Sequence, residues 1–339
     1  MGGRKPILLQ INSEQSYIIG IDIGAKHIRF ALGNLSGKII CYQTIKVPLN
    51  ISEDDLIQSL IKQVYVIMDE SAILKEKVVG IGIGVNGNVE NESGMITYSS
   101  KFELHKAYLK QEIENEFHIK VKVENSARAM ALGEQWFGVG KGFSNLLCIN
   151  VGYDVCAGLI INNQLVKGKH NLAGNIGHMV IDLNGPVCSC GQVGCLKAFI
   201  CHDALKRMVL TEVYAGRNTS LIECMKGDME KISGKIIQKA AKKGDSLSIE
   251  LLKNIGQSLG VACTNMINIF NPDIIIIGGG IGKADEFYMD ELKKVVRQRL
   301  VTTEGKETEI VASKLGDKAT VIGAITLIIT ELYEMNSTP

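Results

Sequence analysis

The sequence has no strong charge of either sign, no long apolar run and no P-loop. Its 37 basic and 36 acidic side chains leave a formal net charge of +1, which excludes the broad basic surface that a free-standing nucleic-acid binder needs. No apolar run approaches the roughly 18 residues of a membrane span, and no apolar signal segment begins the chain. We therefore expect a cytoplasmic protein without a membrane partner. No G-x4-G-K-[ST] sequence occurs, which excludes a P-loop nucleotide site.

Cysteine is present, and its distribution is uneven. The chain has nine cysteines, an odd number, and in a reducing cytoplasm metal is a better use for clustered thiols than disulfides. One histidine and three cysteines follow one another in the order H-x9-C-x-C-G-x2-G-C, namely His178, Cys188, Cys190 and Cys195. Four such ligands close a tetrahedral Zn²⁺ shell and leave no position open, so the pattern predicts a structural zinc site.

Strands and helices alternate in two similar cycles. A chain of 339 residues exceeds the usual size of a single core, and two α/β lobes around a cleft are expected. Hydrophobic patterning predicts strands at 17–23, 27–32, 38–47, 77–85, 121–124, 145–151, 157–161 and 273–277. It predicts helices at 53–74, 107–117, 126–136 and 321–333, and helical structure over 202–268 with weak points at Gly256 and Gly260.

Three glycine-rich turns follow predicted strands. Gly82 to Gly87 matches G-x-G-x-x-G, but turn residues rather than a helix follow the third glycine, so a dinucleotide site is rejected. Asp22-Ile-Gly24 places an acid at a strand end, where it can hold Mg²⁺ near a phosphate. Gly278 and Gly279, with Gly280, form a third loop that admits a close ligand. Ordinary strand-to-helix turns remain the alternative for the last two loops.

Taken together, several motifs resemble the ROK family in order and spacing from Tyr17 onward. They are Asp22-Ile-Gly24, Glu124-Asn125, Gly177-His178, the C-x-C-G-x2-G-C loop, Gly278-Gly-Gly280 and Ile322-Gly-Ala324. That family contains bacterial sugar kinases and sugar-responsive repressors. The resemblance implies the actin/hexokinase-like (ribonuclease H-like) fold, a sugar site between the lobes, a homodimer, and a zinc site that braces the sugar pocket.

The chain departs from the kinases of that family at three places. Ser126 stands where the kinases carry the aspartate that acts as general base, and a serine hydroxyl does not ionise usefully near neutral pH. Tyr153 and Asp154 follow Gly152 in the turn where the kinases have a glycine-rich phosphate loop. Lys26 lies in the first loop, after Asp22 and Gly24, where a threonine is usual. The resemblance therefore implies no catalytic residue, a vestigial nucleotide site, and ATP and Mg²⁺ as improbable ligands.

The sugar-binding set is altered as well. The resemblance implies that Asn125 and His178 are retained from this set, while Asn175 and Lys197 each replace a glutamate. Lys197 inverts the charge at its position, which predicts an anionic effector such as a sugar acid or sugar phosphate. An outward-pointing, solvated lysine is the alternative.

We identify the chain as most similar to the effector-binding and dimerising portion of a ROK repressor. Residues 2–12 resemble the connector that follows the winged helix-turn-helix of such repressors, so DNA contact is expected only through a domain absent from this chain. The expected division is a connector at 1–14, a small lobe of 15–125 plus 318–339, and a large lobe of 126–317 with the zinc loop and dimerisation surface. The alternatives are an ATP-dependent ROK sugar kinase and a pseudokinase scaffold.

Overall fold

The computed structural model describes residues 13–48, 51–90, 93–99, 102 and 106–335. The chain divides into two compact units, one made of the residues up to Glu124 together with those from Ala324 onward, the other of Asn125–Gly323. The expected connector at 1–14 lies almost wholly outside the described residues. No helix in the described part has the length and apolarity to cross a membrane.

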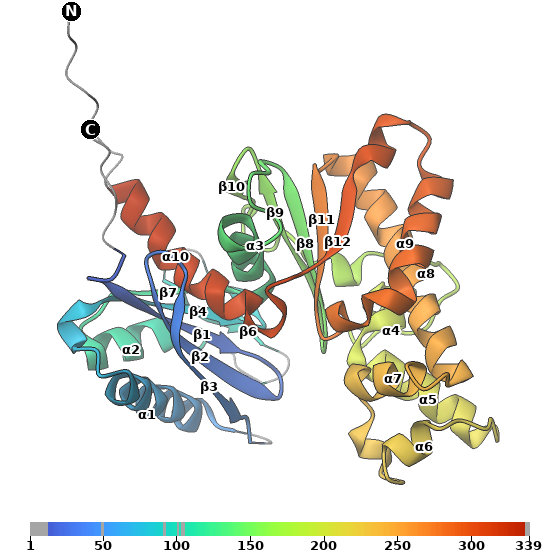
Figure 1. The fold of residues 1–339 in the computed structure, drawn as a ribbon, viewed down its shortest axis with the longest axis horizontal. Helices are drawn as coiled ribbons and strands as arrows, with labels where there is room; N and C mark the ends of the chain where they lie inside the picture. Colours follow the sequence, from blue (N-terminus) through green and yellow to red (C-terminus); the bar gives the residue numbers. More distant parts are fainter. Residues whose placement is uncertain (1–12, 49–50, 91–92, 100–101, 103–105, 336–339) are drawn as a thin grey trace, which may run out of the picture. The chain divides into compact units, whose positions relative to one another are not determined.

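Unit 1 is a five-stranded sheet with helices on its faces (Figure 1). The sheet order is β3-β2-β1-β4-β7, with β1 antiparallel to β2 and parallel to β4. Its strands are β1 (Tyr17–Ile23), β2 (His27–Asn34), β3 (Ile39–Lys46), β4 (Val78–Val85) and β7 (Val121–Asn125), and a small hairpin pairs β5 (Asn88–Val89) with β6 (Ile96–Tyr98). Its helices are α1 (Glu53–Ser71), α2 (Leu109–Phe117) and the later turns of α10 (Ala319–Met335).

The glycines of β4 form a seat for α10. Alternate residues of a strand face opposite sides of a sheet, and Ile81 and Ile83 enter the apolar core of unit 1. A side chain at Gly80 would lie 2.5 Å from Ile328, and one at Gly82 would lie 1.8 Å from the Ala324 carbonyl oxygen. Gly82, the first glycine of the G-x-G-x-x-G sequence, thus serves helix packing together with Gly80.

Unit 2 repeats the strand order with the sequence β10-β9-β8-β11-β12. Its strands are β8 (Leu146–Val151), β9 (Val155–Ile161), β10 (Gln164–Leu165), β11 (Ile274–Gly279) and β12 (Glu309–Ala312). Its helices are α3 (Ser126–Phe137), α4 (Lys197–Ile200), α5 (His202–Tyr214), α6 (Leu221–Cys224), α7 (Gly234–Ala241), α8 (Ser246–Phe270) and α9 (Asp285–Arg299). The main core lies between the sheet and the helices α5 to α9, and α3 packs against β8 and β9.

The helical region of unit 2 differs from the expectation in where it breaks. The chain turns at Gly216, Gly227 and Gly244, each with positive φ, whereas Gly256 and Gly260 lie inside the continuous helix α8. A side chain at Gly256 would lie 2.3 Å from the Tyr288 carbonyl oxygen, so these two glycines let α9 approach α8 closely. The helix α9 and the strand β12 were not among the expected elements.

Candidate functional site

The predicted metal ligands converge on one point. The ligand atoms of His178, Cys188, Cys190 and Cys195 all lie within 4.8 Å of one another. Cys190 Sγ lies 3.8 Å from Cys195 Sγ, and Cys188 Sγ lies 4.0 Å from His178 Nδ1. A tetrahedral zinc shell with Zn–S bonds of about 2.3 Å has edges of about 3.8 Å between sulfurs. The four residues are therefore close enough together to converge on one Zn²⁺ ion.

Two glycines shape the loop that carries the sulfurs. Gly191 has φ +86° and Gly194 has φ +78°, a region that only glycine adopts without strain. A side chain at Gly194 would also lie 1.7 Å from the Asp182 carbonyl oxygen. Both glycines therefore allow the tight turns of this loop.

The thiols of the loop differ in their protonation. A hydrogen bond from the Gln192 backbone lowers the pKa of Cys190 to about 7, whereas burial raises the pKa of Cys195 to about 12. The thiolate is the form that binds metal. A buried thiol such as Cys195 loses its proton more readily when a bound cation offsets the lost hydration of the thiolate. The four clustered ligand atoms leave room for such a cation.

His178 is carried by a segment that rests on the backbone of β9. His178 is the last residue of a short 3₁₀ turn, Ile176–His178. A side chain at Gly177 would lie 2.3 Å from the Val155 carbonyl oxygen, and one at Gly174 would lie 1.9 Å from that of Ala157. The Ala157 amide donates to the Gly174 carbonyl at 2.7 Å. The exposed Asn175 lies in this segment, so its position is fixed by backbone contact with the sheet.

Lys197 lies directly after the metal loop and forms an ion pair. Its Nζ is 3.0 Å from Asp154 Oδ1, and 14% of its side chain is exposed. Burial lowers the pKa of Lys197, but the charge of Asp154 and the hydrogen bond to it outweigh this and hold the pKa above its ordinary value. Lys197 is therefore not the solvated lysine of the alternative interpretation.

The turn that contains Asp154 is held against α5. It joins β8 to β9 and begins with Gly152, whose carbonyl accepts a hydrogen bond of 2.9 Å from the His202 amide. The rings of Tyr153 and His202 stack with centroids 4.2 Å apart. His202 Nε2 donates to the Ile232 carbonyl at 3.0 Å. Sequence reasoning singled out this turn but missed both of its partners, because His202 and Lys197 lie more than forty residues further along the chain.

Asn125 and Ser126 begin the helix α3. The Asn125 side chain caps the helix, accepting from the amides of Ala127 at 2.9 Å and Arg128 at 3.4 Å. Ser126 is the first helical residue and is 8% exposed. Arg128 is buried and donates to the carbonyls of Asn171 at 2.9 Å and Ala173 at 3.2 Å. This arginine, which sequence reasoning missed, ties α3 to the segment that carries Asn175.

The remaining predicted residues lie at strand ends in the two units. In unit 1, Asp22 is buried and its Oδ2 lies 2.8 Å from Arg29 Nη1, while the Gly24 amide closes the hairpin onto the His27 carbonyl at 3.1 Å. In unit 2, Gly278 and Gly279 end β11. A side chain at Gly279, where φ is +80°, would lie 2.3 Å from Asn150 Oδ1.

The repeated sheet order and the Cys₃His loop define an α/β protein of two units with a candidate metal site in the second. The chain belongs to the ROK family, whose model matches residues 18–331. It is 33% identical over 335 residues to a putative xylose repressor of Caldicellulosiruptor sp. strain Rt8B.4, covering 98% of this chain and 82% of the relative. It is 31% identical over 312 residues to a glucokinase of Thermotoga maritima, covering 92% of this chain and 96% of the relative.

A solved structure agrees with this assignment. The crystal structure of a ROK family transcriptional regulator, a homologue of the E. coli MLC protein, matches with a TM-score of 0.85 and 28% identity, over 96% of this chain and 80% of that one. The expected fold of two α/β lobes and the expected family are thus confirmed. Repressors and kinases are both among the relatives, at 33% and 31% identity, so likeness alone does not separate the two activities.

Proposed function

We propose that this chain is the effector-binding region of a ROK transcriptional regulator that responds to a carbohydrate and transfers no phosphate. Ser126 carries the proposal. The family resemblance gives this position to the general base of the kinases, and here it holds a buried hydroxyl at the start of α3. Loss of a general base lowers a rate by roughly 10² to 10⁴-fold.

The two turns that the family resemblance assigns to nucleotide binding support the same proposal. Asp22 is engaged by Arg29 at 2.8 Å and Asp154 by Lys197 at 3.0 Å. A carboxylate neutralised by a basic side chain is a weaker Mg²⁺ ligand, because the ion must compete with that partner. Tyr153 also places a bulky stacked ring in the turn where the kinases have a glycine-rich loop.

In the proposed protein the zinc loop is a brace. His178, Cys188, Cys190 and Cys195 would hold a Zn²⁺ ion that supplies structural cross-linking and no open coordination position. The loop lies between the segment that carries Asn175 and the helix that begins at Lys197. Asn125, Asn175, His178 and Lys197 remain the proposed effector-contacting residues.

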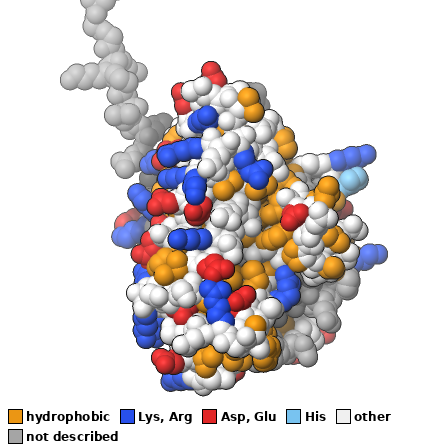
Figure 2. All heavy atoms as spheres, turned by 90° about the vertical axis from the view of Figure 1, so that its right-hand side faces the viewer, with side chains coloured by type: hydrophobic (Ala, Val, Ile, Leu, Met, Phe, Trp, Pro, Cys, Tyr) orange, Lys and Arg blue, Asp and Glu red, His pale blue; other side chains and the backbone are white. Residues whose placement is uncertain are grey.

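DNA contact is assigned in this proposal to residues outside these 339. On the face of the molecule drawn in Figure 2, side chains of both signs are interspersed, in keeping with the net charge of +1. The repressor relatives are matched over 82% of their own length. Translation of the codons that precede residue 1 in the gene tests this assignment, and we expect a helix-turn-helix there.

We also propose a homodimer, which light scattering on the purified chain tests.

Phosphoryl transfer is the sharpest test of the proposed function. The purified chain is assayed for ADP release with ATP, Mg²⁺ and a panel that includes glucose and xylose, and sugar binding is measured in parallel by calorimetry. We expect sugar binding without sugar-dependent ADP release. Ser126→Asp is measured beside the wild type, because it returns a carboxylate to the base position.

The kinase alternative predicts a different pattern. It requires sugar-dependent ADP release that Asp22→Ala abolishes and Asp69→Ala preserves, since Asp69 is an exposed aspartate on α1 of the same unit. That result would overturn the regulator proposal. A tight protein complex recovered from lysate, with no sugar bound by the chain, would instead favour the scaffold.

A further inference from the structure

The Asp154–Lys197 pair has unused hydrogen-bonding capacity. Asp154 Oδ1 accepts from Lys197 Nζ at 3.0 Å and from the Val155 amide at 2.9 Å. Among the residues that the structure describes, none donates to Asp154 Oδ2, and Asp154 is the sole partner of the Lys197 ammonium. An ammonium carries three N–H donors and a carboxylate about four acceptor sites. Each side chain is partly exposed, 24% for Asp154 and 14% for Lys197.

The charges of the pair cancel where a ligand would meet them. An anionic ligand is attracted by Lys197 and repelled by Asp154 at nearly the same distance, so its charge gains little net energy. A pair of neighbouring hydroxyl groups is different, because each hydroxyl both donates and accepts a hydrogen bond. One hydroxyl can donate to Asp154 Oδ2 while the other accepts from the Lys197 ammonium.

We infer that Asp154 and Lys197 together form a subsite that recognises a diol of an uncharged carbohydrate. This inference rests on the proposed effector-binding function and deepens it by naming the ligand class. The family resemblance gives position 197 to a glutamate that contacts sugar hydroxyls, and here the carboxylate is supplied by Asp154 on another element. The departures from the kinase pattern at Asp154 and Lys197 are then related, because the carboxylate lost at position 197 is replaced by the one gained at position 154.

The surroundings of the pair hold it in place before a ligand arrives. The turn is fixed by the Tyr153–His202 stack at 4.2 Å and by the hydrogen bond from the His202 amide to Gly152. Lys197 is fixed at the first turn of α4, and the Leu196 amide before it donates to the Met179 carbonyl at 2.9 Å. A subsite that is ordered in advance loses less entropy on binding than a mobile one.

Calorimetry with matched sugars tests the subsite. The zinc-loaded 339-residue chain is titrated with D-xylose and D-glucose and with D-glucuronate, the acid that keeps the same pyranose ring and ring hydroxyls. We expect a neutral sugar to bind at least about tenfold more tightly than the acid, which is the scale of one charge-assisted hydrogen bond. Asp154→Asn leaves Lys197 without its counter-charge, so we expect the ratio to shift about tenfold toward the acid. Lys197→Met removes the donor and weakens neutral-sugar binding about tenfold.

Three controls separate the subsite from folding and from the proposed function. Lys242→Met removes an ion pair of 2.9 Å with Glu286, between the end of α7 and α9, and should leave both affinities unchanged. The reversed pair Asp154→Lys/Lys197→Asp should recover the neutral preference lost in either single variant. If the wild type binds both classes equally, or Asp154→Asn leaves the ratio unchanged, the subsite is overturned while the effector proposal stands. If the wild type binds no member of the panel, the effector proposal itself fails.

Discussion

The two units share one strand order but differ in how they neutralise the turn after their first strand. In unit 1, Asp22 is the last residue but one of β1, and its partner Arg29 is the directly opposite residue on β2. In unit 2, Asp154 follows β8 and its partner Lys197 comes from α4, beyond the metal loop. The first pairing is built into a hairpin. The second pairing joins residues that lie far apart in the sequence, and the Cys₃His cluster is in the segment between them.

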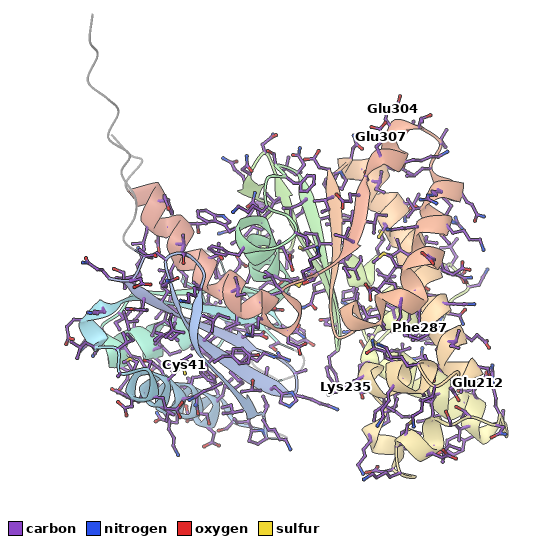
Figure 3. The ribbon with its side chains drawn as sticks, viewed as in Figure 1. Cys41, Glu212, Lys235, Phe287, Glu304 and Glu307 are labelled. Carbon is purple, nitrogen blue, oxygen red and sulfur yellow. The ribbon has the colours of Figure 1, made fainter. Side chains whose placement is uncertain are left out.

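This difference means that the metal loop supports the acidic turn of unit 2 and not that of unit 1. Eight of the nine cysteines lie in unit 2, and unit 1 has Cys41 alone, on β3 (Figure 3). Loss of the loop should therefore release the Asp154 turn and leave the Asp22 turn intact. The sole tryptophan, Trp136, lies on α3 of unit 2, so its fluorescence follows that unit, and hydrogen exchange of β1 and β2 peptides follows unit 1.

The largest effect should come from removal of the metal. Chelation, or Cys190→Ser, removes a cross-link whose binding energy is also folding energy. We expect unit 2 to lose at least about 3 kcal/mol, which for a domain of this size lowers its melting temperature by roughly 6–12 °C. Trp136 fluorescence measures this loss, and exchange protection of β1 and β2 should stay unchanged.

Cys41→Ser is the matched control for the cysteine change. It alters a thiol in unit 1, where burial and then the charge of Glu70 raise the pKa of Cys41. Elemental analysis should find about one zinc per chain in this variant and in the wild type, and much less in Cys190→Ser. A wild-type protein that contains no zinc and is insensitive to chelators would contradict the brace.

A smaller effect is expected at the helix caps, where the units again differ. In unit 2, Asp245 caps α8 by accepting from the Ser248 amide at 2.8 Å, and its other oxygen accepts from Thr219 Oγ1 at 2.8 Å and the Ser220 amide at 2.7 Å. In unit 1, Ser52 caps α1 at the surface through the Asp55 amide at 3.1 Å. Asp245→Ala should cost about 2 kcal/mol, because it also strands buried donors, and Ser52→Ala about 0.5–1 kcal/mol.

Melting curves of the two cap variants measure this difference. Asp290→Ala, an exposed aspartate on α9, is the control for loss of a carboxylate in unit 2 and should change stability by less than about 0.5 kcal/mol. Equal costs for Asp245→Ala and Ser52→Ala would show that the shared hydrogen bonds of Asp245 add nothing to its capping role.

Local features of both units could be predicted from the sequence, whereas contacts between residues far apart in the chain could not. Continuous apolar runs located β1 and β4, and the spacing of one histidine and three cysteines predicted the metal loop. Helix α9 had a readable signal, since its buried residues Tyr288, Leu292 and Val296 recur every four positions, but it was passed over among many charged neighbours. The Asp154–Lys197 pair had no local signal, because its two residues are joined only by the folded metal loop.

The pKa shifts of two glutamates should make the stability of the two units depend differently on pH. In unit 1, burial raises the pKa of Glu331, but Lys120 at 2.7 Å and Lys122 at 2.9 Å outweigh this and hold it below its ordinary value of 4.5. The stability from this group is present above pH 4.5 and is lost as the pH falls through the folded-state pKa. In unit 2, burial raises the pKa of Glu134 above 4.5, despite hydrogen bonds from Ser313 and the Val139 amide.

Glu134 has the opposite sign, because its folded state binds the proton more tightly than the unfolded state does. Its contribution is fully present below pH 4.5 and is lost as the pH rises through its raised pKa. Unit 2 should therefore gain a little stability as the pH falls from 7 toward 5, while unit 1 begins to lose stability only below 4.5. Glu134→Gln should flatten the first trend in Trp136 melts, and Glu331→Gln the second in exchange protection of β7. A common pH profile for both units, unaltered by either variant, would contradict this division.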